Sequence, residues 1–146
     1  MSKKKALIKQ VSGITFAGIT DSNHWVMMDG PQNFGGSDAG IRPKELLLLA
    51  LGGCTGSDVV SILKKKRAKV DDFEIRITSE MQDEHPKVFT SIHIEYVFFG
   101  KEIKKKDVER AIELSETKYC AVTYMLKETV KITNSFKILE SKDEEL

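Results

Sequence analysis

The sequence predicts an α+β fold with the element order βββ-α-ββ-αα-β, in which sheets pack on central helices. Three observations predict it. Short segments rich in β-branched and apolar residues occur at both ends of the chain. A long apolar helical pattern lies between them, and a second, amphipathic helical pattern precedes the last strand. Neither internal repeats nor a low-complexity linker interrupts the 146 residues, so we expect one domain over residues 1–146.

The sequence predicts a meander of strands in the N-terminal part of the chain. Residues 6–10, 14–20 and 24–29 are apolar and β-branched, and the turn-forming groups Ser12-Gly13 and Asp21-Ser22-Asn23 separate them. Residues 29–41 read DGPQNFGGSDAGI, a composition typical of a loop.

The central helix is predicted from Pro43 to about Arg67, over the stretch RPKELLLLALGGCTGSDVVSIL and the basic residues after it. Proline suits a first helical turn, and lysines in the last turn complement the helix dipole. Residues 46–51 are apolar on every side, which indicates a central, buried helix. Gly52 and Gly53 each cost about 1 kcal/mol relative to alanine, so they indicate close packing or a bend.

In the C-terminal part of the chain, the sequence predicts two strands, at residues 73–81 and 88–99. These are followed by a helix at 104–118, further helical turns at 120–128 and a last strand at 129–139. The alternation of Ile92, Ile94, Tyr96 and Phe98 with more polar residues predicts one well-buried face. Residues 140–146 are expected to form a flexible tail.

Composition excludes some functions. With 31% charged residues and a net charge of +1, the chain has no overall field that attracts nucleic acid. No run of about 18 apolar residues predicts a membrane span, and the N-terminus does not resemble a signal peptide. We therefore expect a cytoplasmic protein without nucleic-acid or membrane partners, whose two cysteines are free thiols.

The two cysteines, Cys54 and Cys120, allow two interpretations, as apolar packing residues or as reactive thiols. Asp58 lies four residues after Cys54, on the same helix face, and an anion there disfavours a thiolate. Cys120 follows Lys118 and Tyr119 at a predicted helix N-terminus, which favours a thiolate. The spacing of cysteines and histidines does not match a metal site.

The glycine-rich loop GGSDAG, the segment PKELLLLALGGC and the later KYCAVTYML together resemble the OsmC/Ohr family, the osmotically inducible and organic-hydroperoxide-resistance proteins. The resemblance covers nearly the whole chain. It implies an intertwined homodimer in which sheets from both chains wrap around two central helices, with the active sites at the subunit interface.

The resemblance also implies a cysteine-based peroxidase that acts in oxidative-stress defence. Cys54 would attack an organic hydroperoxide or hydrogen peroxide and become a sulfenic acid, and Cys120 would condense with it to a disulfide. A dithiol such as dihydrolipoamide would reduce the disulfide, and the resemblance implies no bound cofactor or metal.

The sequence departs from the family reductases around the thiols. These have an arginine near the N-terminal strands and a glutamate directly after the helix proline, whereas here residues 13–30 lack arginine and the acid is one place later, at Glu45. Cationic help for Cys54 would then come from Arg42, His24 or Lys118. The alternative is a non-catalytic dimer that holds a small apolar or thiol-reactive ligand beside unreactive cysteines.

Overall fold

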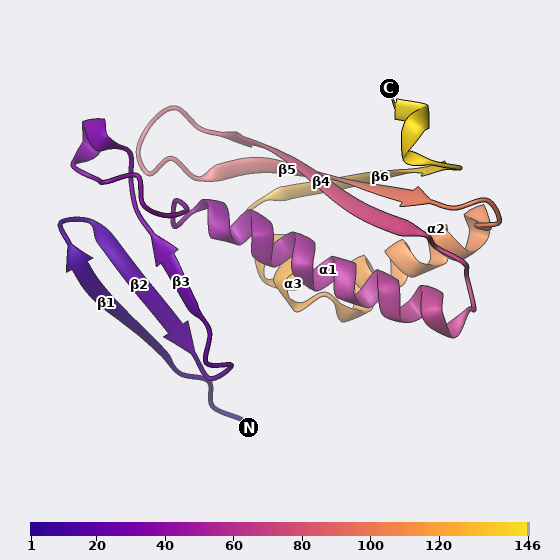
Figure 1. The fold of residues 1–146 in the computed structure, drawn as a ribbon, viewed down its shortest axis with the longest axis horizontal. Coiled ribbons are helices and arrows are strands. Elements are labelled where there is room, and N and C mark those ends of the chain that lie inside the picture. The colour runs from indigo at the N-terminus through magenta and orange to yellow at the C-terminus, as the bar shows by residue number, and fades with distance from the viewer. Residues whose placement is uncertain (146) are drawn as a thin grey trace. The chain divides into compact units, whose positions relative to one another are not determined.

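The computed structural model describes residues 1–145 and divides into two compact units, residues 1–49 (unit 1) and residues from Ala50 onward (unit 2). The element order βββ-α-ββ-αα-β that the sequence predicts is confirmed, and so is the α+β class (Figure 1). Each unit is described by itself, and the single domain over residues 1–146 stays a prediction.

Unit 1 is an antiparallel sheet in the order β1-β2-β3, with β1 (Ala6–Ser12), β2 (Thr15–Thr20) and β3 (Trp25–Met28). Gly13 joins β1 to β2 with a φ of 53°, a left-handed conformation that glycine adopts without steric cost. The predicted loop contains a short 3₁₀ turn, Gln32–Phe34.

The carboxylate of Asp29 organises this loop. It accepts hydrogen bonds from the Thr15 hydroxyl at 2.7 Å, from its neighbour Gly30 N–H at 2.7 Å, and from the Ser37 and Ala39 N–H groups at 3.1 Å each. Burial alone would raise the pKa of Asp29, but these donors outweigh it and lower the pKa below its ordinary value. The side chain is 1% exposed and is therefore a structural anion.

The ends of α1 (Glu45–Lys65) have identifiable caps. At the start, Glu45 accepts a hydrogen bond from the backbone N–H of Arg42 at 3.2 Å, half of a capping box. At the end, Arg67 takes a φ of 57°, and the N–H groups of Arg67 and Ala68 bond to the carbonyls of Lys64 and Leu63. This is the Schellman arrangement, which satisfies carbonyls that the helix leaves free.

Unit 2 contains a sheet in the order β4-β5-β6, with β4 (Asp72–Met81), β5 (Phe89–Phe99) and β6 (Lys131–Leu139). β4 pairs antiparallel with the central β5, and β6 pairs parallel with it. The predicted buried face of β5 is confirmed, because its alternating apolar side chains are at most 1% exposed: Ile92, Ile94, Tyr96 and Phe98. Glu95 pairs with Arg76 on β4 and with Lys137 on β6.

The helices of unit 2 lie together on one face of this sheet (Figure 1). Gly56 allows the approach of α1, because a Cβ there would lie 2.8 Å from Cδ1 of Ile75 on β4. The predicted helix over 104–118 is less regular than expected. α2 (Lys105–Leu114) widens into a π-helical turn, Ser115–Tyr119, before the short α3 (Ala121–Leu126).

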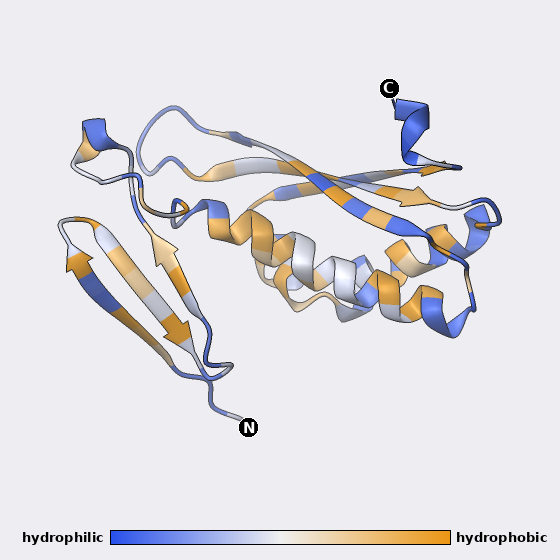
Figure 2. Cartoon of the chain, in the orientation of Figure 1, coloured by the Kyte–Doolittle hydropathy of each residue, from blue (hydrophilic) through white to orange (hydrophobic). Residues whose placement is uncertain are grey.

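Within the single chain, α1 is buried only in part. Leu51, Val59 and Leu63 are buried, but Leu49 is 62% exposed and Val60 is 52% exposed. Figure 2 shows the apolar character of this helix. Within residues 1–145, α1 alone is long and apolar enough to cross a membrane, with a mean hydropathy of 1.8 over its window. A core helix passes the same test, so α1 is not a clear membrane span.

The C-terminal segment forms a 3₁₀ turn, Lys142–Glu145, in which Glu145 pairs with Arg76 and Lys142 pairs with Asp72. The flexible tail over 140–146 stays a prediction, and its final residue lies outside the described part of the chain.

Candidate functional site

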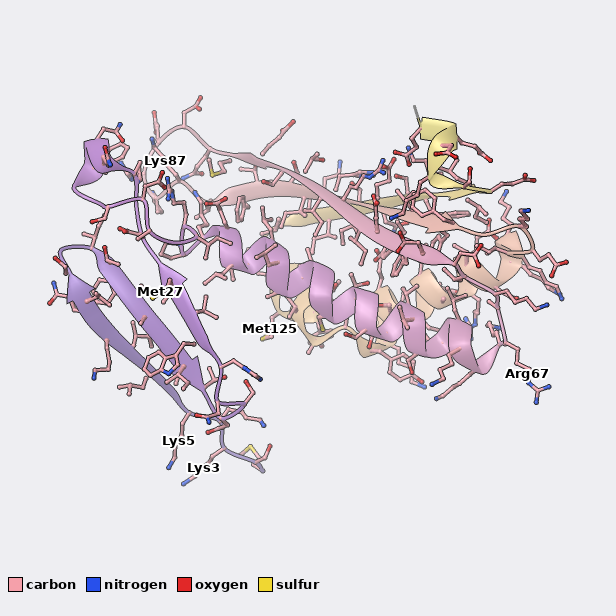
Figure 3. All side chains as sticks on the ribbon, in the orientation of Figure 1. Lys3, Lys5, Met27, Arg67, Lys87 and Met125 are labelled. Atoms are coloured by element: carbon pink, nitrogen blue, oxygen red, sulfur yellow. The ribbon has the colours of Figure 1, made fainter. Side chains whose placement is uncertain are left out.

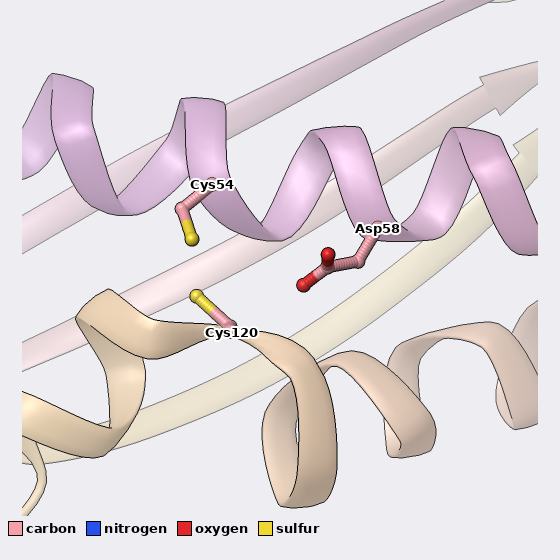
Figure 4. A group of neighbouring side chains, drawn as sticks. All are labelled: Cys54, Asp58 and Cys120. Atoms are coloured by element: carbon pink, nitrogen blue, oxygen red, sulfur yellow. The ribbon is translucent and has the colours of Figure 1, made fainter. Parts of the chain in front are cut away.

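The two thiols of the chain meet in unit 2. A carboxylate oxygen of Asp58 and the Sγ atoms of Cys54 and Cys120 all lie within 4.8 Å of one another (Figure 4). Both cysteines are free, Cys54 half-buried and Cys120 buried. The structure therefore brings together the two cysteines and the aspartate that the sequence analysis selected.

Two elements supply these side chains. Cys54 and Asp58 are four residues apart on α1, so they project from one face of the helix, as predicted. Cys120 comes from the N-cap of α3, where its sulfur accepts a hydrogen bond from the Thr123 N–H at 3.4 Å. The N-terminal position of Cys120 is confirmed. Thr123 is buried, and among the described residues its hydroxyl oxygen has no hydrogen-bond partner.

The net electrostatic effect on Cys120 is opposite to the sequence expectation. Burial raises the pKa of the Cys120 thiol, and this outweighs the side chain and N–H of Thr123, which lower it; nearby Cys54 raises it further. The N-cap hydrogen bond stabilises the Cys120 thiolate, as the sequence analysis expected, but the cost of burying that thiolate away from water is larger.

A chain of buried hydroxyl groups connects the aspartate to the sheet. The Ser115 hydroxyl donates to Oδ2 of Asp58 at 2.9 Å, and its oxygen lies 2.8 Å from Oγ1 of Thr55. Thr55 in turn lies 2.7 Å from the Tyr96 hydroxyl on β5. Because these groups are buried and mutually bonded, they fix the position of the carboxylate beside the thiols.

A second carboxylate joins this network on the other side of Tyr96. Glu116 accepts hydrogen bonds from the Tyr96 hydroxyl at 3.3 Å and from the side-chain amide of Asn134. Burial raises the pKa of Glu116 above its ordinary value, although both hydrogen bonds lower it. Burial also raises the pKa of Tyr96 above its ordinary value. The sequence analysis missed this group, because the π-helical turn that carries Glu116 has no composition signal.

A pocket of about 390 Å³ opens beside Cys120. It is lined by the π-helical turn and α3, including Glu116, Tyr119, Ala121, Tyr124 and Met125. Met125, which is 70% exposed, projects from α3 (Figure 3). The pocket gives a small molecule with an apolar part access to the neighbourhood of the buried thiol.

Of the other predicted supporting residues, Lys118 lines the pocket beside Cys120, and its ammonium lies 5.1 Å from the centre of the Tyr119 ring. His24, Arg42 and Glu45 belong to unit 1. There the Arg42 guanidinium pairs with Asp38 at 2.6 Å, and Glu45 caps α1. A role for these residues beside the thiols stays a prediction.

The fold and the site define a class: an α+β protein in which a long helix and a short helix on one face of a sheet bring two free thiols together. The family model of OsmC-like proteins matches residues 35–135, and the chain belongs to this family, as the sequence resemblance predicted. The chain is 43% identical over 135 residues to protein YhfA of Escherichia coli K12, a match that covers 92% of this chain and 98% of the relative.

Solved structures of other proteins have a fold similar to that of this chain. A hypothetical protein from Aquifex aeolicus is 34% identical, with a TM-score of 0.84, over 97% of this chain and all of that chain. An organic hydroperoxide resistance protein OsmC from Legionella pneumophila is 12% identical, with a TM-score of 0.70, over 94% of this chain and 98% of that chain. The second likeness shows the fold alone.

Proposed function

We propose that the protein is a cysteine-based peroxidase that reduces hydroperoxides in oxidative-stress defence. The observation that carries the proposal is the position of both sulfurs and the Asp58 carboxylate within 4.8 Å of one another. A disulfide needs the two sulfurs to approach to about 2.05 Å, and its formation therefore requires at least one of the two side chains to turn toward the other. The membership in a family with named hydroperoxide resistance proteins supports the same role.

The proposed reaction has two steps, the first at the Cys54 sulfur and the second at the Cys120 sulfur. The Cys54 thiolate attacks the terminal oxygen of a hydroperoxide, the O–O bond breaks, and the alkoxide takes a proton from solvent to leave as an alcohol. Cys54 is now a sulfenic acid. The Cys120 sulfur attacks it, a disulfide forms, and the hydroxyl leaves as water with the thiol proton. Cys54 takes the first role because it is the more accessible thiol.

A dithiol such as dihydrolipoamide would return the enzyme to its reduced form by two thiol–disulfide exchanges, and would itself become a disulfide. The proposed peroxidase therefore needs no bound cofactor. The reaction requires a compartment in which thiols are kept reduced, so we infer that the protein works in the cytoplasm.

We infer that the protein acts as a homodimer. Among residues 1–49, the buried side chains are Thr15 and Asp29, both polar, so the three-stranded sheet of unit 1 lacks an apolar core of its own. Its exposed side chains include Leu7, Ile8 and Trp25, and also Met27, which is labelled in Figure 3. Such a sheet is not stable in water unless another surface covers it.

The exposed side of α1 in unit 2 fits a second copy of the same helix. A Cβ added at Gly53 would meet open space, and Ser57 and Val60 follow at helical spacing along a groove of about 470 Å³. Small residues allow close helix–helix approach, and a second copy would bring its own cations to the thiols.

The direct test mixes reduced protein with cumene hydroperoxide and measures peroxide loss, with dihydrolipoamide as reductant. We expect turnover, and a Cys54–Cys120 disulfide in mass spectra of the non-reduced protein. Cys54→Ser should abolish peroxide loss, while Cys120→Ser, assayed without the dithiol, should leave one reduction per chain and stop at the sulfenic acid. Peroxide loss equal to that of Cys54→Ser would overturn the proposal.

A second candidate is a non-catalytic dimer that binds a small apolar or thiol-reactive ligand. It is favoured by the raised pKa of Cys120 and by the pocket beside that thiol. It predicts that alkylation of Cys120 in the Cys54→Ser variant follows a thiolate whose pKa lies above that of an ordinary cysteine, and that peroxide is not consumed. Rapid alkylation of Cys120 at pH 7, with peroxide turnover in the wild type, would argue against it.

A further inference from the structure

We propose that the reduced protein binds one thiophilic divalent cation, with Zn²⁺ the best fit, through Cys54, Asp58 and Cys120. The three donor atoms lie within 4.8 Å of one another. Around a tetrahedral zinc ion, bonds of about 2.3 Å to sulfur and 2.0–2.2 Å to oxygen place neighbouring donors about 3.5–3.8 Å apart. The side chains therefore need movements of about 1 Å to close on an ion.

The three donor groups suit zinc, and the elements that carry them pack in one unit. Two thiolates and a carboxylate form a ligand set that suits zinc, and they come from two elements, α1 and the N-cap of α3, that pack in one unit. The sequence spacing conceals the set, because Cys120 joins it through the fold rather than through a short motif. Asp58, one helical turn beyond Cys54, supplies the oxygen ligand.

The surroundings resemble the outer shell of a metal centre. Ligating carboxylates are usually held by further hydrogen bonds, and Asp58 accepts one from Ser115, which is held by Thr55. The Thr123 hydroxyl follows Cys120 by one helical turn, is buried and lacks a hydrogen-bond partner among the described residues. A water molecule bound to the ion would satisfy this hydroxyl.

Charge gives a physical reason for the ion. Without a cation, ionisation of two neighbouring thiols beside a carboxylate would gather negative charges in a partly buried place, which is unfavourable. A divalent cation compensates this charge and stabilises the thiolates. Binding is independent of the proposed peroxidase activity, although a Cys54–Cys120 disulfide would remove both sulfur ligands and exclude the ion.

The test uses the full chain, reduced, treated with a chelator and freed of both reagents by gel filtration. Titration with Co²⁺ should give one thiolate-to-cobalt charge-transfer absorption that saturates at one ion per chain, and Zn²⁺ should displace the cobalt. Bound Zn²⁺ should protect Cys54 and Cys120 from alkylation, and binding should release protons from the thiols.

Variants assign the ligands. Cys54→Ser and Cys120→Ser should each lose the saturable absorption. Asp58→Asn should weaken Zn²⁺ binding by at least about 10-fold, the lower figure for loss of an outer-shell partner. Asp83→Asn, an exposed carboxylate in the β4–β5 turn, should bind as the wild type does. Circular dichroism of each variant shows whether it is folded.

Three outcomes would overturn the assignment. Wild-type protein without charge-transfer absorption does not bind the ion through thiolates. Equal binding by a folded Cys54→Ser/Cys120→Ser variant places the ion on other donors. Wild-type affinity in folded Asp58→Asn removes the aspartate from the ligand set. Peroxide turnover is measured separately, so the peroxidase proposal can fail while the metal proposal stands, and the reverse.

Discussion

The Ser115 hydroxyl donates a 2.9 Å hydrogen bond to Oδ2 of Asp58, and so ties the start of the π-helical turn to the middle of α1. The same hydroxyl lies 2.8 Å from Thr55. This contact places a charged group beside two thiols without leaving its oxygen unpaired. It also explains why a serine is fully buried at the end of an amphipathic helix.

Ser115→Ala should lower the free energy of unfolding by about 1–3 kcal/mol, because it leaves a half-buried carboxylate oxygen and the buried Thr55 hydroxyl without a partner that they have in the wild type. Urea unfolding followed by circular dichroism measures the change. Ser61→Ala, at an exposed position on α1, is the matched control and should stay within about 0.5 kcal/mol of the wild type. Equal stability of the two variants would show that the Ser115 contact contributes little.

Val60→Glu should dissociate the proposed dimer while leaving unit 2 folded. Val60 is 52% exposed in the single chain, where a charged residue would cost little, but it lies on the face of α1 that we assign to a second copy. Sedimentation velocity should show a dimer for the wild type and a smaller species for the variant. Val88→Glu replaces an apolar residue of similar exposure, 47%, between β4 and β5, and should remain dimeric.

The sequence predicts the elements of this fold well because their signals are local. Alternation identifies β5, and a helical spacing of four residues places Asp58 beside Cys54. The meeting of Cys120 with Cys54 is not a local property, and the sequence analysis obtained it from the family resemblance. The sign of the Cys120 pKa shift was predicted wrongly, because the depth of burial depends on the whole of unit 2.

Two further features could not be predicted, for different physical reasons. The π-helical turn changes the hydrogen-bond register of the backbone without a special composition, so Glu116 was not recognised as a half-buried acid. The apolar residues of α1 predicted a buried helix, whereas Val60 and Leu49 are exposed in the single chain. Hydropathy does not distinguish a surface that packs within a chain from one that packs against another chain.

Glu116 should make the protein less stable as pH rises above about 4.5. Its folded-state pKa is raised from 4.5, so the folded protein holds the proton more tightly than the unfolded chain does. Its contribution to stability is therefore largest below the unfolded pKa and falls as pH rises through the folded pKa. Glu116→Gln, which cannot ionise, should gain stability relative to the wild type between pH 4 and pH 7.

Urea unfolding at a series of pH values measures this difference, with Glu128→Gln, an exposed glutamate, as the control. The control should differ from the wild type by the same amount at every pH. A difference between Glu116→Gln and the wild type that shrinks as pH rises would mean that the hydrogen bonds from Tyr96 and Asn134 outweigh the burial.

Asp29 should act in the opposite sense, as a carboxylate that unit 1 needs in its ionised form. Its four donors lower its folded pKa below 3.8, so its contribution to stability is present above the unfolded pKa and is lost as pH falls through the folded pKa. Asp29→Asn should loosen the loop at neutral pH, because an amide NH₂ then faces backbone donors. Limited proteolysis should cut residues 31–41 faster in this variant than in Asp21→Asn, whose exposed carboxylate accepts the backbone N–H of Lys5. Equal cleavage rates would show that the charge of Asp29 is dispensable for holding the loop.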